Sequence, residues 1–68
     1  IMNPYLEDLT SIYAKWLENN NISQTMSAED LLYESNDNQI KLADNQKEFL
    51  RSFINIWSEI DNYDYENK

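Results

Sequence analysis

The stretch NQKEFLRSFINIW at residues 45–57 decides the fold class, because its apolar side chains recur at steps of three and four residues. That spacing places them on one face of an α-helix. The stripe consists of Phe49, Leu50, Phe53, Ile54, Trp57 and Ile60, widened by Ile56. Asp44 is a residue type that caps helix starts, and residues 61–68 (DNYDYENK) show no apolar periodicity. We therefore expect a helix that is capped by Asp44, frays near Asn62 and leads into a mobile acidic tail.

A second amphipathic pattern fills the first quarter of the chain. Asn3 can cap a helix, and Pro4 suits the first helical position, where its missing N–H costs nothing. The apolar positions at helical spacing are Leu6, Leu9, Ile12, Tyr13, Trp16 and Leu17. Three asparagines at 19–21 follow, and asparagine tolerates the left-handed conformation that ends many helices. This pattern predicts a helix over residues 4–19.

A shorter helix is expected to begin after Ser27. Ser27 is followed three residues later by Asp30, which is a shortened capping box, and Met26 and Leu31 have the spacing of a hydrophobic staple. The polar run SNDN at 35–38 ends this helix. In the following segment Ile40 and Leu42 alternate with polar residues over too few positions for a strand, so we expect them to plug the core from a loop.

Two long helices, one short helix and polar connections predict an all-α fold, a small three-helix bundle. The 68 residues are enough for one domain only. We expect order over about residues 4–61 and a frayed acidic C-terminal tail over 62–68.

The composition excludes several kinds of chemistry. The chain has no cysteine, histidine or glycine, so it has no disulfide, no thiolate or imidazole ligand, and no glycine-rich phosphate loop. Glu29, Asp30 and Glu34 are the candidate acid and base groups, but the first two are explained as helix-start residues. We predict that the protein is not an enzyme and uses no cofactor.

A calcium loop is the metal site that the sequence comes nearest to. Asp37 and Glu48 stand at the first and twelfth positions of such a loop, between two predicted helices. However, Lys41 occupies a ligand position and Leu42 replaces the required glycine. We therefore expect a polar loop here, and no metal site.

Charge is the strongest functional signal in the sequence. Thirteen acidic and five basic residues give a net charge of −8, which opposes binding to nucleic acid or an anionic membrane. The expected partner is a basic or neutral protein. In one interpretation the carboxylates act as a nucleic-acid mimic: they imitate a phosphate backbone as a charged ridge along the first and third helices and occupy the nucleic-acid-binding surface of that protein. The competing interpretation is that surplus carboxylates only keep a small domain in solution. The candidate contact residues are Glu7, Asp8, Glu18, Glu48, Asp61 and Asp64.

The location expected from the sequence is the cytoplasm. No run of about 18 apolar residues occurs, so no membrane span is predicted. The first residues lack a basic region followed by an apolar stretch, which is the pattern of a secretory signal.

The segments LEDLTSIYAKWL (6–17), SAEDLL (27–32) and NQKEFLRSFINIW (45–57) resemble short acidic proteins of bacteriophage and mobile-element genomes. The resemblance covers most of residues 5–60, rests on helix-start and core residues, and implies no particular active residues. Small acidic phage proteins include inhibitors of restriction and CRISPR nucleases that bind the nucleic-acid groove of the enzyme. The resemblance thus implies an anti-CRISPR-like or similar inhibitor in the host cytoplasm. Two alternatives stay open: a homo-oligomeric structural or accessory phage protein, possible as a homodimer, and an antitoxin that neutralises a basic toxin.

Overall fold

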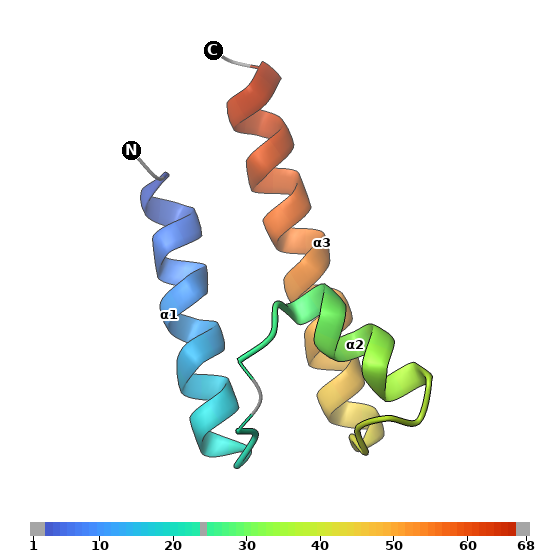
Figure 1. Ribbon diagram of the computed structural model, residues 1–68. Coiled ribbons are helices and arrows are strands. Elements are labelled where there is room, and N and C mark those ends of the chain that lie inside the picture. The colour runs from blue at the N-terminus through green and yellow to red at the C-terminus, as the bar shows by residue number, and fades with distance from the viewer. Residues whose placement is uncertain (1–2, 24, 67–68) are drawn as a thin grey trace.

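Helices α1 and α3 lie side by side in opposite directions, and the short helix α2 crosses the first half of α3 (Figure 1). The computed structural model describes the backbone of residues 3–23 and 25–66, and the side chains of these residues as far as Tyr63. The helices are α1 at Pro4–Asn19, α2 at Ala28–Asn36 and α3 at Asp44–Glu66. Three helices and no strand occur in this part of the chain, so the predicted all-α, three-helix fold is confirmed.

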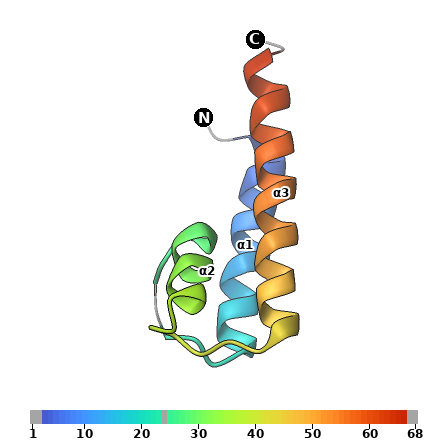
Figure 2. The same ribbon diagram turned by 90° about the vertical axis from the view of Figure 1, so that its right-hand side faces the viewer.

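The turned view shows that α1 and α3 form one layer and that α2 stands to one side of it (Figure 2). One face of the α1/α3 layer is therefore partly covered by α2, and within the described chain the opposite face carries no further helix. The two faces of the layer thus differ.

The starts of α1 and α2 follow the sequence rules. The side chain of Asn3 accepts a hydrogen bond of 2.7 Å from the Tyr5 N–H, and Pro4 is the first helical residue. The Ser27 hydroxyl accepts from the Asp30 N–H at 3.3 Å. Asn21, with φ of 57°, takes the left-handed conformation predicted for the asparagine run. The bounds predicted for the first helix, residues 4–19, are confirmed.

The start of α3 differs from expectation. Asp44 is the first helical residue and not the cap, because the Ala43 carbonyl already accepts from the Lys47 N–H at 3.1 Å. The cap position belongs to Ala43, whose N–H donates to the Gln46 side chain at 2.7 Å. Gln46 also donates to the Asn20 side chain at 3.0 Å, so one residue fixes the start of α3 against the end of α1.

The end of α3 also differs from expectation. The helix continues to Glu66, so the prediction of a frayed tail from residue 62 is wrong as far as Glu66, and residues 67–68 lie outside the described residues. Residues 61–66 contain no proline or glycine to end the helix. Extending an existing helix adds one hydrogen bond per residue without a new nucleation cost, so the weak periodicity of this segment does not stop it.

The core lies where α2 crosses α3. Leu31 of α2 and Leu50 of α3 are completely buried, and Ala28 and Phe53 lie beside them. Ile40 and Leu42 of the α2–α3 loop pack against this cluster while remaining partly exposed, which confirms that the loop plugs the core. The hydrophobic effect is proportional to the apolar area removed from water, so these few side chains supply most of the stability.

Aromatic rings join α1 to α3. The ring of Trp16 stacks on Phe49 with centroids 4.5 Å apart, and Tyr13 meets Phe53 at 5.2 Å. Phe53 continues the row to Trp57 at 6.0 Å. Such aromatic pairs are worth about 0.5–1.5 kcal/mol each beyond their buried area. They also fix the register, because Trp16 lies level with Phe49 and Tyr13 level with Phe53.

We predict that Leu31→Ala leaves much of the protein unfolded at 25 °C. A fully buried leucine contributes about 2–5 kcal/mol, and a core of this size supplies a net stability of only about 3–5 kcal/mol. Urea unfolding followed by circular dichroism at 222 nm measures the loss. The control is Tyr33→Ala on the same helix, where 69% of the side chain is exposed and the expected change is below about 0.5 kcal/mol. Equal effects of the two substitutions would contradict the described core.

Candidate protein-binding site

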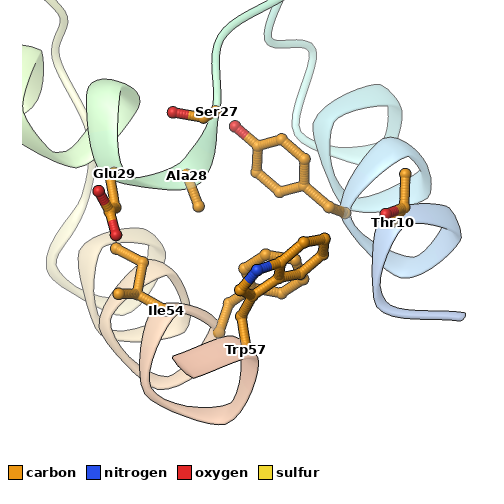
Figure 3. A pocket seen from close by; sticks show the side chains of 8 residues that line it. Thr10, Ser27, Ala28, Glu29, Ile54 and Trp57 are labelled. Atoms are coloured by element: carbon orange, nitrogen blue, oxygen red, sulfur yellow. The ribbon is translucent and has the colours of Figure 1, made fainter. Parts of the chain in front are cut away.

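A partly open pocket of about 350 Å³ lies where α1, the start of α2 and α3 meet (Figure 3). Figure 3 shows Thr10 on one side of the pocket and Glu29 with Ile54 on the other, with Trp57 below them. The lining is mostly apolar. It consists of Thr10, Tyr13, Ser27, Ala28, Glu29, Phe53, Ile54 and Trp57.

The hydroxyl groups of the pocket take part in the protein's own hydrogen bonds. The Tyr13 hydroxyl donates to the Met26 carbonyl at 2.6 Å, which ties α1 to the segment before α2. Thr10 donates to the Leu6 carbonyl of its own helix at 2.9 Å, and Ser27 caps α2. What the pocket can offer a ligand is therefore apolar contact area, the indole N–H of Trp57 and one carboxylate, Glu29, at its edge. This combination suits an apolar side chain that has a basic residue next to it in the partner protein.

Burial raises the pKa of Tyr13 above its usual value near 10, and the negative charge of Asp30 raises it further. Both causes favour the neutral phenol, which is the form that donates to Met26. The folded state therefore holds the Tyr13 proton more tightly than the unfolded chain does.

The carboxylates lie on the surface. Every Asp and Glu whose side chain the structure describes is exposed except Glu34, which is half-buried. On α1, Glu7 and Glu18 are eleven residues apart, so they share one face at a separation of about 16 Å along the helix axis. Asp8 is turned about 100° away from Glu7.

The predicted contact residues on α3 do not share a face. Glu48 and Asp61 are thirteen residues apart, which turns them about 140° away from each other. Asp61 lies one turn beyond Trp57 and thus on the side of α3 that carries the pocket. Asp64 belongs to α3, but its side chain lies outside the described residues. The structure therefore spreads the candidate residues over several faces and brings no single acidic ridge together.

The pocket was missed by the sequence interpretation, which explained Glu29 by its place in the first turn of α2. A usable signal was present in the helix lengths. The nine residues of α2 are too few to cover the apolar stripe of the 23-residue α3. Apolar side chains of α3 beyond the start of α2, such as Ile54 and Trp57, are consequently left partly uncovered.

The described residues form neither a metal site nor a membrane-spanning helix. In the described part of the chain, no group of three or more carboxylates could hold a metal ion. Over the same residues, none of the helices combines the length and apolar character needed to cross a bilayer.

A scan against protein-family models, a search of curated proteins and a search of solved structures each found no match. The resemblance to short acidic phage proteins therefore stays a prediction.

We predict that stability falls as the pH rises above about 10. Above the pKa of the unfolded tyrosine, the unfolded state binds fewer protons than the folded state, so the free energy of unfolding decreases with pH. Tyr13→Phe removes this contribution of Tyr13. The phenylalanine variant is expected to lose about 0.5–1.5 kcal/mol at neutral pH, because the bond to Met26 is absent, but to show a flatter decline at high pH. Urea unfolding at pH 7 and pH 10.5 measures both effects.

The matched control is Tyr33→Phe, which removes a hydroxyl from an exposed ring. It should leave the stability at neutral pH unchanged. A Tyr13→Phe protein with the wild-type slope would contradict the described environment of this side chain.

Proposed function

We propose that this protein is a non-enzymatic, acidic binding module that occupies a basic surface of another protein. In the cell it would inhibit a host protein that binds nucleic acid, such as a defence nuclease. The observation that carries the proposal is the net charge of −8 on 68 residues, displayed by carboxylates that are almost all exposed.

Electrostatics explains why such a surface selects its partner. Complementary charge accelerates encounter and disfavours partners of like charge. Duplex DNA carries one negative charge per about 1.7 Å of axis, so Glu7 and Glu18 on one face of α1 fall well short of that density. The field of the whole molecule, and not a copy of the phosphate spacing, is therefore the feature that would recognise a basic groove.

The pocket complements this field. Interface energy concentrates in a few apolar or aromatic anchors that are surrounded by weaker contacts. An apolar side chain of the partner can enter between Trp57 and Ile54, with a basic neighbour beside Glu29. Charge would then bring the partner close, and apolar contacts of this kind would help to hold it.

The resemblance to phage proteins supports assigning the chain to a bacteriophage or mobile element, with the host cytoplasm as its place of action. An antitoxin that neutralises a basic toxin would use the same mechanism on a different partner. Both proposals require charge-dependent binding to a basic protein.

A homo-oligomeric accessory protein is the second candidate function. It is favoured by exposed apolar side chains on the face opposite α2, among them Tyr5 and Ile12. Sedimentation equilibrium at micromolar concentration separates the two candidates. If the protein is a monomer at this concentration, the second candidate function is contradicted, whereas a dimer would support it.

We predict that partner binding weakens at least about tenfold between 50 and 500 mM salt, because screening shortens the reach of exposed charges. Immobilised protein would be used to capture host proteins from lysate at both salt concentrations, and the affinity of the captured partner would then be measured. Capture that does not change with salt would contradict the proposal.

Charge reversal tests the same proposal by residue. Glu7→Lys with Glu18→Lys changes one face of α1, and Glu48→Lys with Glu59→Lys makes the same charge change on α3. Each pair should preserve helicity and weaken binding at 50 mM salt, with the larger loss marking the face that contacts the partner. The proposal fails if both pairs bind the captured partner as tightly as the wild type.

A further inference from the structure

The face of the α1/α3 layer opposite α2 carries no further helix in the described chain (Figure 2). Four large apolar side chains of α1 and α3 are exposed. Their exposed fractions are 69% for Tyr5, 50% for Ile12, 47% for Ile56 and 67% for Tyr63. Scattered single apolar residues are normal on a protein surface, so the question is whether these form one patch.

Helix geometry places them together. On α1, Tyr5 and Ile12 are seven residues apart and so share a face; Ile56 and Tyr63 do the same on α3. Thr10 and Ile54 line the pocket next to α2. Residues two positions further along a helix are turned about 160° away. Ile12 and Ile56 therefore both point to the side opposite α2.

The register of the two helices places the α1 pair, Tyr5 and Ile12, level with the α3 pair, Ile56 and Tyr63. Because Tyr13 meets Phe53 across the antiparallel pair, Ile12 lies about two residues, or 3 Å along the axis, from the level of Ile56. The same offset relates Tyr5 to Tyr63. We call these four residues the exposed stripe, and it follows the seam between α1 and α3.

Negative charge flanks the exposed stripe. Asp8 stands one turn from Ile12, and Glu59 stands one turn from Tyr63; both carboxylates are exposed. By the same register Asp8 and Glu59 are almost level, one on each border. Glu48 lies further along the α3 border, and Lys15 is the basic residue on the α1 border.

We propose that the exposed stripe is the docking surface for an amphipathic helix of the basic partner, a proposal that rests on the function proposed above. The four residues of the stripe extend over about 10 Å along the seam, from the level of Ile12 and Ile56 to the level of Tyr5 and Tyr63. A helix of about 14 residues covers this length with roughly one turn beyond each end. Such a helix buries apolar anchors at positions i, i+3, i+4 and i+7. Lysine or arginine side chains on its flanks would meet Asp8 and Glu59.

Charge complementarity favours this occupant over a second copy of the chain. In a symmetric dimer the same patch faces itself, so Asp8 and Glu59 of both copies would approach one another. Each copy also carries a net charge of −8, and like charges facing each other across an interface are costly. A cationic helix meets neither obstacle and could pack on the exposed stripe as α2 packs on the other face of the layer.

The test uses a synthetic 14-residue helical peptide with leucine at the four anchor positions and lysine on both flanks. Its control is a scrambled peptide of identical composition, which keeps the charge and loses the apolar face. In amide ¹H–¹⁵N NMR spectra of the labelled full-length chain, we expect the first peptide to shift the signals of Tyr5, Ile12 and Ile56. The scrambled peptide should bind at least about tenfold more weakly. Shifts centred on α2 or the pocket, or equal binding of both peptides, would overturn the proposal.

Variants provide an independent measurement. Ile12→Ser with Ile56→Ser should weaken peptide binding at least about tenfold, whereas Tyr33→Ser on the exposed side of α2 should leave it unchanged. If the Ile12→Ser/Ile56→Ser protein and the wild type bound the peptide with equal affinity, the proposal that the exposed stripe is the docking surface would be overturned. A wild-type dimer at micromolar concentration that this double variant dissociates would overturn it in favour of a second copy.

The two proposals fail separately. If capture of the partner by the wild-type protein does not depend on salt, the proposed function is contradicted. If the Ile12→Ser/Ile56→Ser protein still captures the partner at wild-type strength and with the same salt dependence, only the docking proposal is contradicted.

Discussion

The burial of Leu50 against Leu31 is the contact on which the rest of the structure depends. These are the two completely buried side chains in the described residues, and they join the shortest helix to the longest. A nine-residue helix is too short to be stable alone in water, so α2 exists because its apolar side packs on α3. The packing of α2 on α3 in turn positions the α2–α3 loop, which brings Ile40 and Leu42 to the core and leads into the start of α3.

The same contact divides the surface into two sides. With α2 on one face of the α1/α3 layer, its first turn and the uncovered part of α3 form the pocket beside Glu29. The opposite face keeps its apolar side chains exposed along the seam. Carboxylates border both surfaces, so the proposed recognition combines apolar contact with a negative field, and a partner needs basic and apolar groups close together.

Local sequence rules predicted much of the fold. The periodicity of 4–19, the cap at Ser27 and the loop plug at Ile40 and Leu42 depend on nearby residues, and each is confirmed. The cap of α3 was misplaced because Asp44 is the better capping residue type, whereas the cap position falls on Ala43, whose N–H is bound by the Gln46 side chain three residues later. The candidate site was harder to predict. The carboxylates could be listed, but the faces that they share depend on helix phase, and the position of the pocket depends on where the start of α2 lies along α3. The helix lengths indicate that part of α3 stays uncovered, but they do not give that position.

The most direct test of this account is the set of interhelical nuclear Overhauser effects in the full-length chain at a concentration where it is monomeric. The account predicts cross-peaks between the methyl groups of Leu31 and Leu50, and between the rings of Trp16 and Phe49, in the same sample. A folded helical monomer that lacks the leucine cross-peaks would contradict the placement of α2, and with it both the pocket and the uncovered opposite face.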